Sequence, residues 1–511
     1  MSPIARTEDL DGSAGPDLQA VTADALAVLQ PGFEGTTAPA WVLRLIDEGL
    51  GSVALFSRNV ASPDQVAALT AQLRAKRPDL LVTADEEGGD VTRLEARGGS
   101  SFPGNLALGA VDDVALTRAV AAELGRRLAA CGVDFDWAPS ADVNSDPDNP
   151  VIGVRSFGAD PELVARHTAA YVEGLQSAGV AASVKHFPGH GDTAVDSHHA
   201  MPRIDVDLDT LRSRELVPFR AALAAGAKAV MSAHILVPAL DPELPGTLSP
   251  AVLGGLLRAP VEEGGLGYDG LVVTDGIEMQ AISGTYGIER GTVMAIAAGC
   301  DAICVGGGRS DEQTVLDLRD AIVAAVKDGS LPAERLADAA RRVRELAAWA
   351  AAQRSGAAEG SAPDTGIGLT AARRALRVTR AAHHTPLDAP PYVAAFTPMA
   401  NIAVGDVTPW GVAAELERLL PGTRTGSYRT ADAAEVLAAA GGSRVVAVVR
   451  DAHRHPWMAQ ALAGLVAARP DTIVVEMGVP QSEPVGSLYV ATHGAARVCG
   501  EAAAEVIAAR D

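Results

Sequence analysis

The feature that most constrains the fold is an alternation of short apolar runs with longer amphipathic segments. The amphipathic segments include residues 62–76, 113–132 and 160–179, where Ser62 and Asp160 are placed to cap the helix starts. Runs this short and rich in Val, Ala and Ile indicate strands buried on both faces. The runs are ALAVL (26–30), SVALF (52–56), LLVTAD (80–85), VDFDWAP (133–139), AASVKHF (181–187), AKAVMSAHI (227–235), GLVVTD (270–275) and DAICVGG (301–307).

Eight such repeats predict an α/β fold of the (β/α)₈ TIM-barrel type. A doubly wound sheet shares the alternation and is the main alternative. Polar residues follow several of the runs, and active sites of barrels form at the carboxyl ends of the strands. The position of the polar residues therefore favours the barrel.

The composition changes after the helical stretch 332–354. Ile367 is the only large apolar residue in 355–368, which we interpret as a linker. Strand-like runs then return among Ala-rich segments and predict a smaller α/β sandwich domain with a mostly parallel sheet. We expect a flexible N-terminus (1–17), a catalytic barrel (18–354), the linker (355–368) and a C-terminal domain (369–511). The strand-like runs of that domain are 391–398, 443–450, 471–478 and 487–494.

Charge and hydropathy disfavour several classes of partner. The chain of 511 residues has a formal net charge of −22 and no basic cluster, which disfavours nucleic acid and anionic lipid as partners. It has no run of eighteen apolar residues and no signal-like N-terminus, so we expect a cytoplasmic protein. Cys300 and Cys304 are predicted to be small buried side chains rather than metal ligands or a disulfide. Neither a metal nor a cofactor is expected.

The most informative stretch is KHFPGHGDTAVDSHHAMP (185–202), which holds four of the eleven histidines. Its Pro and Gly residues predict a loop over the barrel mouth. Asp196 and His198 are one residue apart, so the carboxylate can orient the imidazole and form a proton shuttle. A structural role for the histidine is one alternative. A zinc site is another, formed by His186, His190, Asp196 and His198, although Lys185 would lie close to the cation.

Asp275 ends the apolar run GLVVTD, where a carboxylate is costly unless it contacts a ligand or a cation. Asp85 ends LLVTAD in the same way, and Arg155 can offset such charges and bind sugar hydroxyls. Each could instead form a salt bridge at the barrel rim. Retaining glycoside cleavage needs a nucleophile and an acid, and Asp275 and His198 can fill these roles.

These residues resemble glycoside hydrolase family 3, in particular its bacterial β-N-acetylglucosaminidases. The run KHFPGHGDTAVDSHHAMP is the most specific part of the resemblance. The other matching stretches are ADEEGGDVTRLE (84–95), FDWAPSADVN (135–144), VIGVRSFG (151–158), MSAHI (231–235), PGTLSP (245–250) and GLVVTDGIEM (270–279).

The resemblance implies that Asp275 forms a covalent glycosyl-enzyme and that Asp196 and His198 are the acid/base dyad. It also implies that the sugar hydroxyls are held by Asp85, Arg155, Lys185 and His186. Two residues depart from the family pattern. Asp90 stands where Arg or Lys often follows the double glycine, and Gly276 stands where Asp often follows the nucleophile.

The leading interpretation is an exo-β-N-acetylglucosaminidase that acts on muropeptides or chitin oligosaccharides during peptidoglycan recycling, as a monomer or homodimer with only a carbohydrate as partner. The alternatives are a phosphorylase that uses phosphate instead of water, a broad β-glucosidase and a non-catalytic sugar-binding regulatory protein. A phosphate-binding metabolic barrel is a further possibility, because GGGR (306–309) follows the eighth apolar run.

Overall fold

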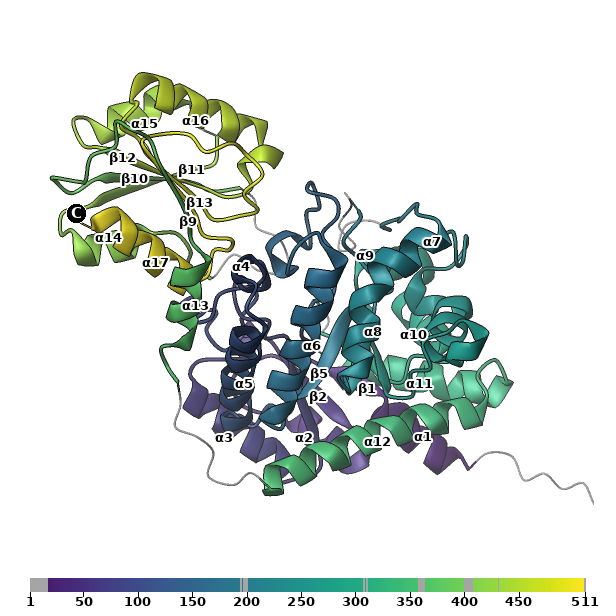
Figure 1. Ribbon diagram of the computed structural model, residues 1–511. Helices are drawn as coiled ribbons and strands as arrows, with labels where there is room; N and C mark the ends of the chain where they lie inside the picture. Colours follow the sequence, from purple (N-terminus) through teal and green to yellow (C-terminus); the bar gives the residue numbers. More distant parts are fainter. Residues whose placement is uncertain are drawn as a thin grey trace, which may run out of the picture.

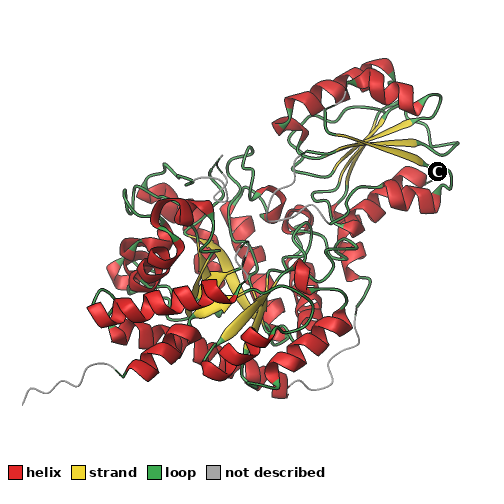
Figure 2. Cartoon of the chain, turned by 180° about the vertical axis from the view of Figure 1, so that it is seen from behind, coloured by secondary structure: helices red, strands yellow, loops and turns green. Residues whose placement is uncertain are grey.

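The computed structural model describes residues 17–193, 195, 201–306, 308, 311–356, 364–398, 408–430 and 432–509. Figure 1 shows a barrel surrounded by helices and a smaller α/β domain beside one of its rims. The same two bodies are seen from behind in Figure 2, where the strands lie inside both and the helices outside.

The strands of the barrel follow one another in chain order. Parallel pairing joins β2 through β7, a separate parallel pair joins β1 to β8, and a bridge between Val273 and Ala302 connects β7 with β8. Since β1 also lies beside β2, the ring closes, and the predicted (β/α)₈ barrel is confirmed. The strands are β1 (Leu29–Pro31), β2 (Ser52–Leu55), β3 (Leu81–Ala84), β4 (Phe135–Asp136), β5 (Ala181–Phe187), β6 (Ala229–Ser232), β7 (Leu271–Thr274) and β8 (Ile303–Val305).

Helices return the chain from each strand to the next around the outside of the barrel, and between β6 and β7 this is a π-helix, Ala251–Arg258. Ser62 and Asp160 cap α3 and α6, as the sequence predicts, and accept hydrogen bonds from the backbone N–H of Gln65 and Glu162. The α-helices of this domain are α1 (Leu18–Ala27), α2 (Ala40–Glu48), α3 (Pro63–Arg74), α4 (Asn105–Val111), α5 (Val114–Ala130), α6 (Pro161–Ser177), α7 (Leu208–Thr210), α8 (Leu216–Ala224), α9 (Gln280–Tyr286), α10 (Ile288–Ala298), α11 (Glu312–Asp328) and α12 (Ala333–Gly356).

The first predicted strand, 26–30, is wrong over half of its length. Helix α1 continues to Ala27, and β1 is only Leu29–Pro31. Ala25, Leu26 and Ala27 are buried like strand residues, because α1 packs against α11 and α12. A short apolar run does not distinguish a buried helix end from a strand, which explains the error.

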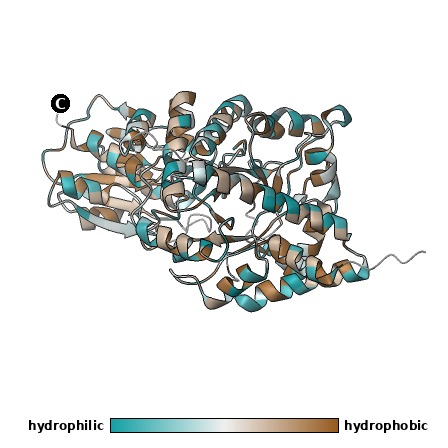
Figure 3. Ribbon diagram, turned by 90° about the horizontal axis from the view of Figure 1, so that it is seen from below, coloured by the Kyte–Doolittle hydropathy of each residue, from teal (hydrophilic) through white to brown (hydrophobic). Residues whose placement is uncertain are grey.

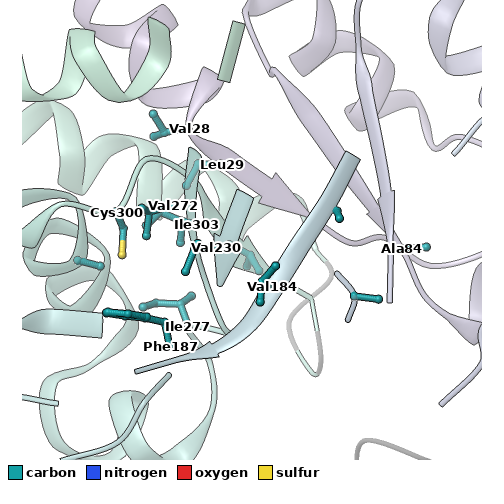
Figure 4. Close-up of a cluster of buried hydrophobic side chains, with 14 of the residues drawn as sticks. Val28, Leu29, Ala84, Val184, Phe187, Val230, Val272, Ile277, Cys300 and Ile303 are labelled. Atoms are coloured by element: carbon teal, nitrogen blue, oxygen red, sulfur yellow. The ribbon is translucent and has the colours of Figure 1, made fainter. Parts of the chain in front are cut away.

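The side chains of each barrel strand alternate between two cores. In β7, Val273 points into the barrel interior with Met231 of β6, whereas Val272 belongs to the layer between strands and helices. Figure 4 shows part of this outer layer, where Val272, Ile303 and Leu29 come from neighbouring strands. The helices in Figure 3 carry hydrophilic and hydrophobic bands along their length, as expected for helices with one buried side.

Helix α12 closes the amino-terminal end of the barrel. Its residues Val343, Leu346, Ala347 and Ala350 belong to the same cluster as the interior side chains of the strands. The Lys228 ammonium lies 5.3 Å from the centre of the Trp349 ring. The helix runs across the bottom of the barrel in Figure 1, so the carboxyl ends of the strands form the opposite, open end.

The C-terminal domain is a three-layer sandwich. Its sheet has the order β11-β10-β12-β13-β14-β9 and is parallel apart from β9. In β12, Val446 and Val448 pack toward α14 and α17, while Val445 and Ala447 pack toward α15 and α16. The elements are α13 (Ile367–Ala375), β9 (Arg377–Arg380), β10 (Tyr392–Phe396), α14 (Ala413–Leu419), β11 (Arg424–Tyr428), α15 (Ala433–Ala440), β12 (Val445–Val449), α16 (Pro456–Ala468), β13 (Ile473–Glu476), β14 (Leu488–Ala491) and α17 (Arg497–Ala508).

The sequence predicts four strands of this sheet and misses its two edges, β9 and β11. Most of the edge residues are exposed or partly exposed, so these strands lack a continuous apolar run. The predicted linker, 355–368, begins at the end of α12 and ends within α13, and its residues 357–363 lie outside the described part of the chain. The domain boundaries stay a prediction.

Candidate active site

The described candidate residues gather at the open end of the barrel. Asp85 directly follows β3, Asp275 directly follows β7, and Lys185 and His186 lie near the end of β5. Arg155 comes from a short 3₁₀ turn, Gly153–Arg155, in the connection after β4. The carboxyl ends of parallel strands meet at one rim, which brings residues far apart in sequence into one region.

A buried ion network joins the loops after β3 and β4 to β5. Lys185 Nζ lies 2.5 Å from Asp85 Oδ1 and 2.6 Å from Glu87 Oε1. Arg155 binds Glu87 through Nε and Nη2, with Nη2 2.6 Å from Oε1 and Nε 3.0 Å from Oε2. Arg93 Nη2 lies 2.7 Å from the other carboxylate oxygen of Asp85. The network therefore holds three cations and two carboxylates in fixed positions.

Mutual attraction keeps this network charged. Burial alone would raise the pKa of Asp85 and of Glu87, but Lys185 and Arg155 hold both values below their ordinary range. Burial alone would lower the pKa of Lys185, and the two carboxylates raise it instead. Because each buried charge has a partner, the cost of burying it is largely offset. A ligand would meet charged donors and acceptors that are already aligned.

The His186 ring lies between the Asp142 carboxylate and the Arg155 guanidinium. Its Nδ1 lies 2.7 Å from Asp142 Oδ2, and its Nε2 lies 3.3 Å from Arg155 Nη2. The guanidinium can only donate, so Nε2 accepts and the proton sits on Nδ1, facing Asp142. Asp142 also accepts the backbone N–H groups of His186 and His190, at 3.1 and 2.7 Å. Asp142 thus fixes both the ring of His186 and the start of the loop that follows β5, which we call the histidine loop (residues 188–202).

The first part of the histidine loop passes close to the connection after β4. A Cβ atom on Gly191 would overlap the Val143 carbonyl oxygen, at 1.7 Å, so this position requires glycine. The His190 ring stands edge-on to the His186 ring, with centres 5.8 Å apart. Burial and His186 lower the pKa of His190 to about 4, against the opposing charges of Asp142 and Asp275. His190 is therefore neutral near pH 7.

The backbone around Asp275 is held by β6. The Asp275 N–H donates to the Ser232 carbonyl at 3.1 Å, and Asp275 Oδ1 accepts the Gly276 N–H at 2.8 Å. His234 Nε2 donates to the Gly276 carbonyl at 2.9 Å, while its Nδ1 lies 2.8 Å from Thr247 Oγ1. The peptide that follows Asp275 is thus fixed from the neighbouring strand.

Two further carboxyl groups near Asp85 are stabilised in their protonated form. Asp136 is fully buried in β4, and its Oδ1 accepts the Glu86 N–H at 2.9 Å. Burial raises the pKa of Asp136 well above its ordinary value. Burial also raises the pKa of Glu86 to about 7, despite hydrogen bonds from the backbone N–H groups of Arg93 and Leu94. Of the three consecutive residues Asp85, Glu86 and Glu87, the first and the third are thus held in the ionised form.

The structure brings together Asp85, Arg155, Lys185 and His186, and it places Asp275 at the same rim. Asp196 and His198 belong to residues 196–200, which lie outside the described residues, so their approach to Asp275 stays a prediction. The sequence reasoning missed Glu87 and Asp142. Both lie in stretches that match the family. Buried cations such as Lys185 and Arg155 need carboxylate partners, and this need could have pointed to Glu87.

The sequence also raised the possibilities of a metal site, a phosphate site and a disulfide. All four cysteines are free and buried, as predicted for Cys300 and Cys304. Among the described residues, no group of three His, Cys, Asp or Glu side chains is arranged to hold a metal ion. Of the GGGR stretch, residues 307 and 309 are not described. No helix within the described ranges is long and apolar enough to cross a membrane.

Comparison with known proteins gives consistent matches. The model of the glycosyl hydrolase family 3 N terminal domain matches residues 31–346. Beta-hexosaminidase A of Pseudoalteromonas piscicida is 35% identical over 341 residues, covering 61% of this chain and 55% of that protein. A Beta-hexosaminidase of Alkalilimnicola ehrlichii is 39% identical over 286 residues, covering 54% and 80%. The chain thus spans little more than half the length of the first of these relatives.

Solved structures also match over both domains. One of them is a glycoside hydrolase family 3 beta-N-acetylglucosaminidase from Paenibacillus sp. str. FPU-7, with 36% sequence identity and a TM-score of 0.84. The match covers 95% of this chain and 96% of the other. The likeness therefore extends over the barrel and the C-terminal sandwich.

Proposed function

The chain belongs to glycosyl hydrolase family 3, and we propose that it is a retaining exo-β-N-acetylglucosaminidase. The observation that carries this proposal is the single rim shared by Asp275 and the ion network around Asp85, Lys185 and Arg155. The names of the two hexosaminidase relatives and of the solved acetylglucosaminidase support the choice of sugar.

The proposed reaction has two displacements. An Asp275 carboxylate oxygen attacks the anomeric carbon, and the bond from that carbon to the leaving oxygen breaks. His198, oriented by Asp196, gives its proton to the leaving oxygen. The imidazole then takes a proton from water as the water oxygen attacks the anomeric carbon and releases Asp275. The sugar keeps its β configuration because the anomeric carbon is inverted twice.

The network binds the sugar in this scheme. Asp85 offers carboxylate oxygens to hydroxyl donors, while Lys185 and Arg155 donate to hydroxyl oxygens. His186 completes the set from its fixed position beside Arg155. Because these side chains already hold one another in place, binding orders few of them, and little free energy is lost to reorganisation.

The finer assignments follow from the same proposal. The substrates are terminal β-linked N-acetylglucosamine units of muropeptides or chitin oligosaccharides, and the setting is peptidoglycan recycling in the cytoplasm. The carbohydrate is the expected partner, with neither nucleic acid nor a membrane involved. The working form is a monomer or a homodimer. The acidic composition, with a net charge of −22, supports the exclusion of nucleic acid.

An assay with an aryl β-N-acetylglucosaminide tests the proposal. Wild-type protein should release the aryl alcohol much faster from this substrate than from the matching β-glucoside. Asp275→Ala should lower kcat by about 10³-fold or more, because the group that forms the covalent intermediate is removed. Residual activity near that of the wild type would contradict the assignment. Equal rates on both substrates would favour a broad β-glucosidase, and tight sugar binding without turnover would favour a sugar-binding protein.

The same assay separates water from phosphate as acceptor and tests the acid. Sugar 1-phosphate formed in phosphate buffer would identify a phosphorylase, and free sugar alone identifies a hydrolase. His198→Ala should slow substrates with poor leaving groups far more than activated aryl substrates, because only the former need a proton on the leaving oxygen. An equal loss on both kinds of substrate would contradict the role of His198.

A further inference from the structure

Asp90 departs from the family pattern and lies in the turn that carries Glu87. The Glu87 N–H donates to the Val91 carbonyl at 3.1 Å, and Gly88 pairs with Val91 in an antiparallel bridge. Gly89 has φ +63°, and a Cβ there would come within 2.4 Å of Gly104 Cα, so the turn is tightly enclosed. Asp90 and Glu87, three residues apart, are therefore joined by a turn with little room to change its conformation.

The charge of Asp90 is satisfied by the C-terminal domain. The Arg450 guanidinium, just after β12, forms a salt bridge with Asp90 Oδ2. The Ala495 N–H, in the segment before α17, donates to Asp90 Oδ1 at 2.7 Å. The Asp90 side chain is only 2% exposed and that of Arg450 16%. A buried carboxylate without such partners would be strongly unfavourable, so docking of the domain and the conformation of the turn depend on each other.

The same domain also contacts the segment that carries Arg155. His453 Nε2 donates to the Pro147 carbonyl at 3.0 Å, and a Cβ on Gly153 would lie 3.7 Å from Val479. Gly153 begins the 3₁₀ turn that ends at Arg155. The C-terminal domain thus touches both segments whose side chains form the buried Glu87–Arg155 ion pair.

We propose that Asp90 and Arg450 are a positioning pair through which the C-terminal domain holds the Glu87 turn, and with it Arg155 and Lys185, in the sugar-binding arrangement. The pair contacts no reacting atom and acts through Glu87. The proposal rests on the proposed function for its kinetic consequence. Loss of the pair should weaken sugar binding and leave the chemical step, which depends on Asp275 at the end of β7, largely intact.

The test compares Asp90→Ala, Asp90→Asn and Arg450→Ala with Arg374→Ala as a matched control. Arg374, in α13, also bridges the two domains, through Asp113 at the start of α5, but these side chains are 47% and 34% exposed. On an aryl β-N-acetylglucosaminide, Asp90→Ala and Arg450→Ala should raise KM about 10-fold with kcat within about 3-fold of wild type. Asp90→Asn, which keeps an acceptor for the Ala495 N–H, should give a smaller rise, and the control none.

A second measurement does not depend on turnover. Hydrogen–deuterium exchange of residues 86–94 should be faster in Asp90→Ala and Arg450→Ala than in Arg374→Ala. Asp90→Asn supplies the same readout if Asp90→Ala does not fold. Active Asp90→Ala or Arg450→Ala with KM within twofold of wild type, or turn exchange in these variants that matches the control, would overturn the positioning role. A wild-type protein without activity on the substrate would instead overturn the proposed function, and the exchange measurement would still decide the positioning role.

Discussion

At the scale of single residues, the site is organised by which carboxyl groups keep their charge. Asp85 and Glu87 are ionised because Lys185 and Arg155 lie beside them, whereas burial favours the protonated form of Glu86 and Asp136. Charge is thereby kept on the carboxylates that pair with cations. Because Glu86 loses its proton near pH 7, the stability of the folded protein should depend on pH.

Glu86→Gln should remove part of that pH dependence. The pKa of Glu86 is about 7 in the folded protein and 4.5 when unfolded, so the folded state binds more protons between these values. Its contribution to stability is full below pH 4.5 and is lost as the pH rises through 7. Gln carries no such proton, so the thermal midpoint of wild type should fall relative to the variant between pH 5 and pH 8. A difference in midpoint that stays constant over this range would contradict the assignment.

At the scale of elements, the two ends of the barrel have separate tasks. Helix α12 fills the amino-terminal end, while the loops after β3, β4, β5 and β7 carry the site at the other end. Damage to α12 should therefore reduce stability without changing the chemistry.

Leu346→Ala in α12 tests this separation. Leu346 is 5% exposed and belongs to the cluster that closes the barrel, so its truncation should lower the free energy of unfolding by about 3 kcal/mol. Glu345→Ala, on the exposed side of the same helix, is the control and should change it by less than about 0.5 kcal/mol. Chemical denaturation measures both, and kcat of the folded variants should match wild type. A large loss of kcat in folded Leu346→Ala would show that the two ends are coupled.

The elements also show how far the sequence predicts the structure. Runs such as AASVKHF become a strand over their whole length, because their apolar pattern reflects burial on both faces. The region around Ala27 misleads for the same reason, since a buried helix end has the same composition. The edge strands β9 and β11 carry little apolar signal.

Site residues, like strands, are predictable only where a local sequence pattern marks them. Asp85 and Asp275 are predictable because each ends a strand. The partners Glu87 and Asp142 lie in loops and meet residues of β5 that are 44 to 98 positions away in sequence, as Asp142 meets His186 and Glu87 meets Lys185. No local pattern encodes which carboxylate will meet which cation.

At the scale of the whole molecule, the C-terminal domain lies beside the rim that carries the candidate site, away from α12 (Figure 1). Its contacts with the Glu87 turn and with the segment before Arg155 support the proposed role of the domain in sugar binding rather than in bond cleavage. In this proposal the barrel supplies the nucleophile, and the second domain stabilises the residues that bind the sugar.

The identity of the nucleophile is the central claim, and trapping the intermediate tests it most directly. A fluorinated N-acetylglucosaminyl substrate with a good leaving group slows the second displacement and lets the glycosyl-enzyme accumulate. Mass spectrometry of the digested protein should then find one sugar on the peptide containing Asp275, and none in Asp275→Ala. A sugar attached to another residue, or turnover with no adduct and an inverted product, would contradict the account.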